Sequence, residues 1–591
     1  MRAGAVVAGS AALVFVPVVV ALVAVARPTW YPTGDMAQAE LHVRGFWSHP
    51  PLVGAAGRIQ NADGVQGSHP GPALWLAMWP LYAALGSGSL ALMISVATVH
   101  LATLVLVLWL AWRRGGPVFT VVLAGCLAFV VRAGGSGVFT EPWNPWMGLL
   151  PFLVFVLALW CLLERDLWAA VLAVAAGSYC IQAHAGYLLI VGGMLVVVTG
   201  LVVRDVWRDE LRHDRRRVAA WAGWATLAGA AAWLPPLVDQ VRRSPGNVSI
   251  LADNFRHPDG PYLGFGDVAE IVVVQLNLFG PWVFGPGRDS FDVVAAVGFV
   301  GVLALWALAV RSARSRGAAA EMRIHALLGV AWVLAVVSIA RIFGPYFEYT
   351  VRWLWLLTVL VNTASVWTLW RNRGVSAERV MTIAVVSVAI AVTAVATVQF
   401  GSRAEPTGAI DSRIVGGLVP EIIDDLDDSE RYLLRWWDPA VLGATGFGTV
   451  LELERRGFTV GVDAQFAAAV LPHRVQPEAT ASAVLYLVLG EVSIERARRT
   501  PGLVELGGFE PRDAAEQERS AELRDEIERL LTDDGQADRV ALLDAYYGQA
   551  QLLFNEPPPP PGVRDLLGEY IDLRQPAVMF RAQPGTPVLP L

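Results

Sequence analysis

The sequence predicts a polytopic α-helical membrane protein, with about eleven transmembrane helices in residues 1–400 and a C-terminal soluble α/β domain in residues 401–591. Hydrophobic residues make up 55% of the 591 positions and charged residues only 16%, whereas soluble domains approach about a quarter charged. The charge is also divided unevenly. Residues 1–400 hold 27 Arg against 20 acidic residues, and residues 401–591 hold 18 Arg against 32. Two parts in different solvents are therefore expected.

Eleven apolar runs are long enough to be membrane helices, because a bilayer core of about 30 Å needs about 20 apolar residues per helix. They lie at 5–26, 88–112, 117–132, 146–163, 167–182, 185–203, 218–236, 290–310, 324–342, 349–370 and 379–399. The first run ends in Ala24-Val25-Ala26, which resembles a signal-peptidase site. Its apolar stretch is longer than the core of a signal peptide, so we expect a retained helix.

Arginine placement predicts the orientation of these helices, since cytoplasmic loops are enriched in basic residues. The Arg-rich segments 113–114, 204–217, 311–323 and 371–379 all fall in alternate loops. This pattern predicts a cytoplasmic N-terminus, outer loops at 27–87, 133–145 and 237–289, and an extracytoplasmic C-terminal domain. The Ala, Val, Gly and Arg bias, without any Lys, indicates a GC-rich bacterial genome such as that of an actinobacterium. The expected location is the inner (plasma) membrane.

The tail has the pattern of a small α/β domain. Its pattern consists of apolar runs at 432–437 and 483–489, a helix at 446–456, a short strand at 458–462 and a charged helix at about 513–532. Five prolines at 557–561 indicate a polyproline spacer before a last helix and strand. The acidic run 421–430 is typical of a solvated helix face, although a metal site is the alternative interpretation. No nucleotide-binding or hydrolase motif occurs in this domain.

The first outer loop holds the most informative acids. Asp35 follows the first predicted membrane helix by about nine residues, which places it at the outer water–lipid boundary. With Gln38 it also fits a helix cap and capping box, and the two roles are compatible. Glu40 and Arg44 fit an i,i+4 ion pair on the same helix, while Glu40 is also a candidate for acceptor binding. These alternatives remain open at the level of sequence.

The same loop ends in the motif Ser68-His69-Pro70-Gly71-Pro72, followed by the apolar segment 73–86 with Pro80-Leu81-Tyr82 and Gly86. A helix, an acid soon after it, His-Pro-x-Pro and then an apolar helix with Pro-x-Tyr and Gly occur in that order. This order resembles the GT-C superfamily of membrane glycosyltransferases. Its members include protein O-mannosyltransferases, the lipid A aminoarabinose transferase and mycobacterial arabinofuranosyltransferases. The motif-bearing match covers residues 5–90, and the helix number and external tail extend it loosely over the chain.

The resemblance implies inverting transfer of a hexose or pentose from a polyprenyl-phosphate donor to a glycan, lipid or protein acceptor at the outer leaflet. The first-loop acid would be the base, which assigns that role to Asp35. The family pattern often has two adjacent acids, or a pair split between the first two outer loops. This chain has Gly34-Asp35-Met36. The base therefore depends on Asp35 alone, with Glu141 of the second outer loop as a candidate partner.

A phosphate leaving group needs cationic donors near the outer helix ends. Arg341 and Arg352 flank the turn 342–348, against the positive-inside trend, and are candidates for this role. Snorkelling, or pairing with Glu348, is the alternative. His69 and Arg44 are further candidates for binding the donor phosphate. His69 could also hydrogen-bond within its own loop or coordinate a divalent ion.

The second outer loop, Phe139-Thr140-Glu141-Pro142-Trp143-Asn144-Pro145-Trp146, suits a sugar. Sugar C–H faces stack on indole rings, and sugar hydroxyls bond to carboxylates and amides. Glu141, Trp143, Asn144 and the nearby His184 are therefore candidates for binding sugar or acceptor. An aromatic belt at the membrane surface explains the two Trp residues equally well, and His184 fits a structural role.

The remaining expectations concern a lid, cofactors, partners and alternative functions. Loop 237–289 is long enough to be a lid over the site. No cofactor is required by the pattern, and a divalent metal ion is left open because no compact ligand cluster is visible. The expected partners are the lipid-linked donor, the acceptor and membrane lipids, with no nucleic acid. A transporter or flippase of lipid-linked saccharides is the main alternative, and a non-catalytic assembly scaffold is the other.

Overall fold

The computed structural model describes residues 3–27, 29–208, 215–288, 290–371, 375–440, 443–555 and 557–586. The chain forms two compact units. The first, called the helical unit here, contains residues 1–26 and 50–405. The second, called the sheet unit, contains residues 27–49 and 406–591. The predicted boundary lies at residue 400, and the second unit resumes at residue 406. However, residues 27–49, which were predicted to be part of the first outer loop, pack with the C-terminal residues.

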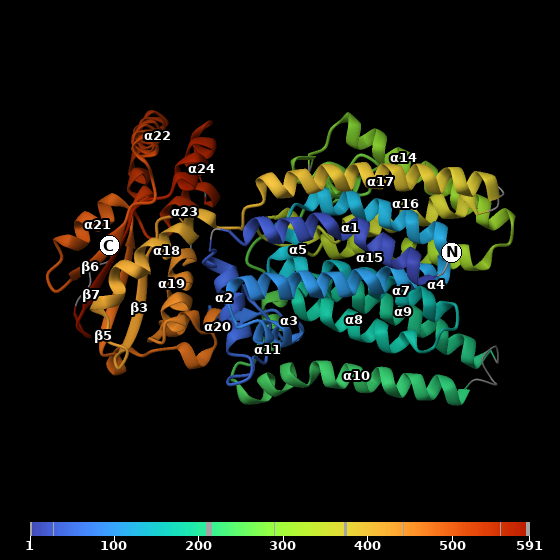
Figure 1. Ribbon diagram of the computed structural model, residues 1–591, viewed down its shortest axis with the longest axis horizontal. Helices are drawn as coiled ribbons and strands as arrows, with labels where there is room; N and C mark the ends of the chain where they lie inside the picture. The colour runs from blue at the N-terminus through green and yellow to red at the C-terminus, as the bar shows by residue number, and fades with distance from the viewer. Residues whose placement is uncertain are drawn as a thin grey trace. The chain divides into compact units, whose positions relative to one another are not determined.

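The helical unit is a bundle of long apolar helices that run roughly along one axis (Figure 1). Its main helices are α1 (Ala3–Val25), α3 (Ala73–Ala84), α4 (Ser89–Gly134), α7 (Leu149–Leu163), α8 (Ala169–Ala183), α9 (Leu188–Trp207), α10 (Arg215–Arg242), α14 (Val293–Ser315), α15 (Ala319–Ile339), α16 (Leu354–Trp370) and α17 (Val375–Arg403). Short helices lie between them: α5 (Gly137–Thr140), α6 (Asn144–Met147), α11 (Asn247–Arg256), α12 (Phe265–Gln275), α13 (Pro281–Phe284) and the 3-10 turns η1 (Ala185–Tyr187), η3 (Pro286–Arg288) and η4 (Glu348–Val351).

Eight helices among the described residues are long and apolar enough to cross a membrane, which makes the chain a multi-pass membrane protein. A helix occupies each of the eleven predicted positions, so the difference lies in length and composition. Helix α4 contains two predicted runs and would be about 69 Å long if straight, twice the bilayer core. It is interrupted at Gly116, whose φ of 71° favours glycine. Helix α8 has only 15 residues, and the uncharged run 218–236 of α10 is rich in Ala, Gly and Trp, which makes it less apolar than the other helices.

The centre of the bundle is formed by α7 and α16. The apolar window of the segment Asn144–Leu163 is 89% buried and that of Glu348–Trp370 is 83% buried, whereas the window of Val293–Ser315 is only 22% buried. A helix that is apolar on all sides belongs in a core or in lipid. Here α7 and α16 contact other helices on most sides, and α14 presents most of its side chains outward.

The loops at one end of the bundle are structured. Strands β1 (Ala56–Gln60) and β2 (Gln66–Ser68) form an antiparallel hairpin. Helix α11 contacts this hairpin, and the backbone N–H groups of Gln60 and Ser68 donate to Asn254 and Asn247 at 3.2 and 2.8 Å. A bridge also joins Tyr262 to Phe343. Loop 237–289 is therefore held by hydrogen bonds to neighbouring loops in this structure, rather than lying free as a lid.

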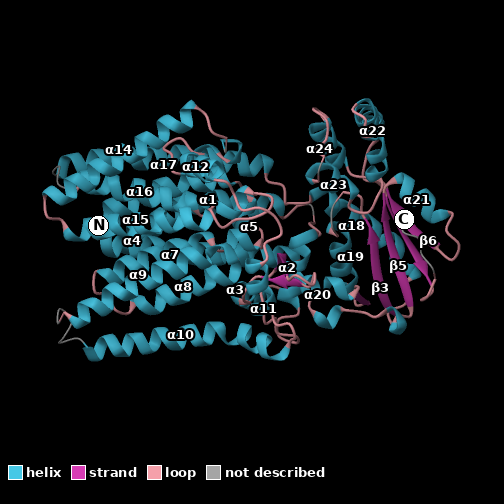
Figure 2. Ribbon diagram, turned by 180° about the vertical axis from the view of Figure 1, so that it is seen from behind, coloured by secondary structure: helices cyan, strands magenta, loops and turns pink. Residues whose placement is uncertain are grey.

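The sheet unit contains five strands in the order β4-β3-β5-β7-β6 (Figure 2). They are β3 (Arg431–Trp437), β4 (Thr459–Gly461), β5 (Ala483–Leu489), β6 (Val504–Phe509) and β7 (Ala577–Ala582). Strands β4, β3 and β5 are parallel, with Leu434 opposite Leu485, and β7 is antiparallel to both β5 and β6. Every residue of β5 is buried, as expected for a central strand.

Helices surround the sheet: α18 (Ala409–Ile422), α19 (Ala444–Arg455), α20 (Ala467–Val470), α21 (Glu491–Arg498), α22 (Ala514–Asp533), α23 (Gly548–Phe554) and α24 (Val563–Leu573). A second apolar core, which includes Leu523, Ile527 and Leu567, joins α22 to α24. Helix α2 (Gly34–Arg44), from the N-terminal part of the chain, contacts α19 and α20. Strands β3, β4 and β5 and helices α19 and α22 lie within two residues of their predicted positions. Helix α18 and strand β6 were not predicted.

Candidate functional site

The predicted base, Asp35, lies in the first turn of α2 and is exposed. The N-cap position belongs to Thr33, so the prediction of Asp35 as the cap is wrong, although Gln38 does donate to it at 3.5 Å. A carboxylate in the first turn is stabilised by the helix dipole in its ionised form. The buried face of α2, which includes Met36 and Leu41, packs in the sheet unit.

The other two candidates on α2 have partners far away in the sequence. Arg44 donates to Glu454 at 3.1 Å, and Glu40, which is fully buried, pairs with Arg455. The expected Glu40–Arg44 ion pair is thus replaced by two pairs with α19. Burial would raise the pKa of Glu454, but its hydrogen bonds from Arg474 and the nearby Arg44 lower the pKa overall. These contacts give Glu40 and Arg44 a structural role between α2 and α19.

His69 and His184 come together in the helical unit, with ring centroids 4.7 Å apart. The Nδ1 atom of His69 accepts a hydrogen bond from the Ala185 N–H at 3.1 Å, and Nδ1 of His184 accepts from Gly186 N–H at 3.2 Å. Burial, and then the neighbouring His184, lower the pKa of His69 well below 6.5. Burial and the charge of Arg58 lower the pKa of His184 to about 4. Both rings are therefore neutral at pH 7, with the proton on Nε2.

The loop 139–146, predicted as the second outer loop, is largely buried. Asn144 donates to the Ala183 carbonyl at 3.0 Å, which ties this loop to the end of α8. Glu141 is also buried, at the C-terminus of α5, and its carboxylate lies against Gly137. Trp143 packs on Trp146 and Tyr349, with centroids 4.8 and 4.7 Å apart. The two tryptophans of this loop thus belong to an aromatic cluster inside the protein.

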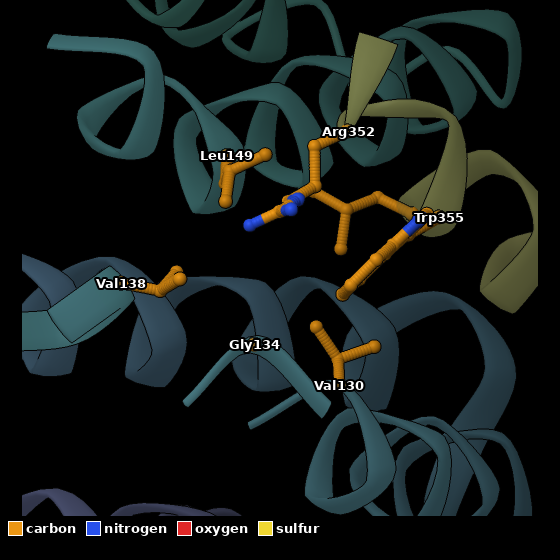
Figure 3. Close-up of a pocket in the computed structure, with 7 residues that line it drawn as sticks. Val130, Gly134, Val138, Leu149, Arg352 and Trp355 are labelled. Carbon is orange, nitrogen blue, oxygen red and sulfur yellow. The ribbon is translucent and has the colours of Figure 1, made fainter. Parts of the chain in front are cut away.

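Arg352 is the most distinctive cation of the helical unit. Its guanidinium lies 4.6 Å from the Trp146 ring and 5.0 Å from the Trp355 ring, and its side chain is only 10% exposed. The ion pair with Glu348 is long, at 3.7 Å. Figure 3 shows the guanidinium pointing into a small pocket. The other lining residues are apolar and come from α4, α5, α7 and α16: Val130, Gly134, Val138, Leu149, Trp355 and Leu356.

This arrangement suits an anion. A cation flanked by two indole rings and apolar side chains is poorly hydrated, so an added negative group interacts with it more strongly than in water. The free volume of the pocket, about 10 Å³, is near the minimum for one water molecule. Binding of a phosphate group beside Arg352 would therefore require the lining side chains to move.

Sequence reasoning missed Arg58 and Tyr349. Arg58, on β1, donates to the Tyr349 hydroxyl at 3.2 Å and lies 3.9 Å from the centre of the Phe347 ring. Since Tyr349 also packs on Trp143, these residues join the β hairpin to the aromatic cluster. The signal that identified Arg352, an Arg in an outer loop against the positive-inside trend, also applies to Arg58. Its aromatic partners are distant in the sequence.

Arg341 lies elsewhere. It is exposed, and its guanidinium is 5.7 Å from the Tyr262 ring, which contacts Phe343. Within the described ranges, no three His, Cys, Asp or Glu side chains gather in a way that could hold a metal ion. The structure therefore joins Trp143, Arg352 and Arg58 in one cluster, and His69 with His184 beside it.

Comparison with known proteins identifies the fold. No protein-family model and no curated protein matches the sequence. The crystal structure of ArnT from Cupriavidus metallidurans bound to undecaprenyl phosphate matches at a TM-score of 0.54 and 14% identity, over 85% of this chain and 96% of that chain. The apo structure of the same protein matches at 0.51 and 14% identity, over 84% and 95%.

The archaeal oligosaccharyltransferase AglB from Archaeoglobus fulgidus, in complex with an inhibitory peptide and a dolichol-phosphate, matches at 0.38 and 11% identity, over 82% of this chain and 69% of that one. That TM-score is too low to define a shared fold. The ArnT match covers nearly the full length of both chains. The chain therefore shares the fold of ArnT.

Proposed function

We propose that this protein is a glycosyltransferase that moves a monosaccharide from a polyprenyl-phosphate carrier to a cell-envelope glycan, lipid or protein. The observation that carries the proposal is the fold, which is similar to that of ArnT bound to undecaprenyl phosphate over most of both chains. A buried cation in an apolar pocket of the helical unit supports it, because a lipid phosphate needs such a partner.

In the proposed reaction, an acceptor hydroxyl attacks the anomeric carbon of the donor sugar. The new C–O bond forms as the bond from that carbon to the phosphate oxygen breaks, and the polyprenyl phosphate leaves with the electron pair. Asp35 takes the hydroxyl proton, a step that contributes about 10²–10⁴-fold in rate. Attack from the side opposite the phosphate inverts the anomeric configuration. The exposed position of Asp35 in the first turn of α2 supports its role as an ionised base.

The donor phosphate would be bound by Arg352, with Arg341, His69 and Arg44 as further candidates from the sequence. The surroundings of these four residues support a phosphate-binding role to different degrees. Arg352 lies between two indole rings and is only 10% exposed, whereas Arg44 is held by Glu454 at 3.1 Å. His69 would act through its Nε2–H as a neutral donor, since Nδ1 accepts from the backbone.

The sugar or acceptor would contact Trp143, Asn144, Glu141, His184 and Glu40. Trp143 has the strongest support, because it lies in a cluster of aromatic rings and cations from three loops. Sugar C–H faces pack on such rings, and the Arg58 guanidinium offers donors to hydroxyls. We add Arg58 and Tyr349 to these candidates.

We further propose an inner-membrane location with the N-terminus cytoplasmic and the C-terminal unit extracytoplasmic, from the Arg-rich loops. An arabinofuranose or mannose donor would fit an actinobacterial source. The alternatives, a transporter or flippase of lipid-linked saccharides and a non-catalytic scaffold, have no observation in their favour beyond the same composition.

The test uses the full chain in proteoliposomes with radiolabelled polyprenyl-phosphate arabinofuranose or mannose and membrane acceptors. Asp35→Asn is expected to reduce transfer by at least 10²-fold, and Arg352→Gln to raise the KM for the donor. Asp63→Asn, at the exposed turn of the β1–β2 hairpin, is the matched control and should transfer normally. Full activity of Asp35→Asn would remove Asp35 as the base. Movement of the labelled lipid across the bilayer without any transfer would favour the flippase instead.

A further inference from the structure

Between α11 and α14, the short helices α12 and α13 pack against the ends of the long helices of the bundle. Helix α12 leads to the non-helical turn Leu276–Gly280, and α13 follows. The buried residues of α12, including Val268, Ile271 and Val274, pack on α14, α15 and α16. This segment was predicted from sequence as part of an outer loop.

Three hydrogen bonds give the depth of the turn. Asn277 Nδ2 donates to the Ala295 carbonyl at 3.0 Å, the Leu278 N–H donates to Gly298 at 3.3 Å, and Thr358 Oγ1 donates to the Gln275 carbonyl at 2.7 Å. Helix α14 begins at Val293 and α16 at Leu354. At 1.5 Å per residue, the turn therefore lies about 3–8 Å inside the ends of both helices.

Non-helical backbone is tolerated at membrane depth only where protein satisfies its polar groups. Asn277, which is buried, does this for the turn. Its Oδ1 accepts from the Phe279 N–H at 2.7 Å, and its carbonyl accepts from the Trp282 indole N–H at 2.7 Å. Gly298 makes room for it, because a Cβ there would lie 1.8 Å from Asn277 Oδ1. Protein groups thus provide hydrogen-bond partners for the turn in the absence of water.

The outward side of the same segment is apolar. Phe265 is 94% exposed, and Phe279 and Phe284 are also exposed. Helix α12 packs on α14, a candidate membrane span whose first turns carry exposed valines: Val293, Val294, Val297 and Val300. Two acids of α12 are exposed beside these rings, and each accepts a backbone hydrogen bond: Asp267, in the first turn, from the Gly264 N–H, and Glu270, in the middle of the helix, from the Phe291 N–H.

We propose that residues 265–284 form a re-entrant segment embedded in one leaflet of the bilayer, with Phe265, Phe279 and Phe284 in contact with lipid acyl chains. A surface of exposed phenylalanines is costly in water and favourable at the boundary between headgroups and acyl chains. Because α12 packs on α14, whose exposed valines belong to a candidate membrane span, we infer that lipid acyl chains cover the exposed phenylalanines as well.

The experiment uses spin labels on the full chain in nanodiscs of phosphatidylethanolamine and phosphatidylglycerol. Phe265→Cys and Phe279→Cys are each labelled with a nitroxide, and collision with oxygen and with the water-soluble Ni–EDDA complex is measured. Both labels should collide more with oxygen than with the nickel complex. The control Asp63→Cys should show the reverse. The three native cysteines are buried or half-buried, and the labelled unmodified chain gives the background.

Phe265 is so exposed that its replacement removes little packing, so this variant is expected to fold. Nickel accessibility equal to that of Asp63→Cys at both positions would overturn the proposal, because the segment would then lie in water. Spectral broadening from a second label nearby would overturn it as well, since a second copy of the chain would then cover the surface.

Discussion

Replacing Arg455 by Met is expected to loosen α2 from α19 and thereby to reveal what Glu40 does. Glu40 is fully buried and Arg455 is 16% exposed, so the pair is shielded from water. Removing the cation leaves the carboxylate of Glu40 in a buried place, a change that costs about 3–5 kcal/mol. Glu40→Gln should cost less, about 1–2 kcal/mol. The amide can still accept from Arg455, which keeps a second ion pair with Glu452 at 3.4 Å.

The double variant decides between a structural and a functional Glu40. If the ion pair is the main role, adding Glu40→Gln to Arg455→Met causes no further loss, and the coupling energy is about 1–2 kcal/mol. Hydrogen exchange of peptides from α2 and α19 in the full chain measures the opening free energy. Because 1.4 kcal/mol is a factor of ten, protection in Arg455→Met should fall by about two to three orders of magnitude.

The matched control is Arg498→Met in α21 of the same unit. Arg498 pairs with Glu495 and Glu505 at the surface, so its loss should change stability by less than about 1 kcal/mol. Transfer activity is measured on the same variants. A coupling energy near zero, together with a raised acceptor KM in Glu40→Gln, would refute the structural role and assign Glu40 to acceptor binding.

Three other outcomes are expected. Burial lowers the pKa of His42 to about 4, so the folded chain binds fewer protons than the unfolded chain between pH 6.5 and 4. Stability is thus full above pH 6.5 and falls by about 2 kcal/mol by pH 5, and hydrogen exchange of α2 should show a flatter pH profile in His42→Asn. Gly298→Ala should displace Asn277 and raise hydrogen exchange in the turn Leu276–Gly280, where an unchanged rate would contradict the close approach. Tyr349→Phe removes the hydrogen bond from Arg58, which is worth about 0.5–1.5 kcal/mol. The KM for the donor sugar or the acceptor should rise up to about tenfold. The melting temperature should fall by no more than a few degrees.

The helices and strands of this protein could be predicted because their signals are local. The run of apolar residues that forms β5 and the runs that form α7 and α16 are visible within about 20 residues. Length limits are also local, but they do not confirm the count of eleven, since eight of the described helices meet them. The apolar run of α8 is only 15 residues long in the structure, and α4 contains two runs around Gly116.

The partners of the site residues could not be predicted, because they depend on contacts between distant segments. Glu40 and Arg455 are 415 positions apart, and Arg58 meets Tyr349 across 291 positions. Within α2 the i,i+4 rule was the best local guide for Glu40, but tertiary packing provided a cation from α19. The sequence did show that an Arg at an outer helix end is unusual, and Arg352 has the surroundings that this signal implies.

The packing of α2 suggests a reason why the chain carries a C-terminal unit. The buried residues of α2, including Met36, Leu41 and Glu40, form part of the sheet unit, so the helix that carries Asp35 depends on α19 for its position. A chain that ends at residue 405 should retain the membrane helices but leave this face of α2 exposed. If Asp35 is the base, the truncated chain should bind the polyprenyl-phosphate donor in the membrane and fail to transfer the sugar. Donor binding measured by spin-labelled lipid, beside transfer of radiolabelled sugar, separates the two steps. Normal transfer by the truncated chain would show that neither the sheet unit nor its packing against α2 is needed for the reaction.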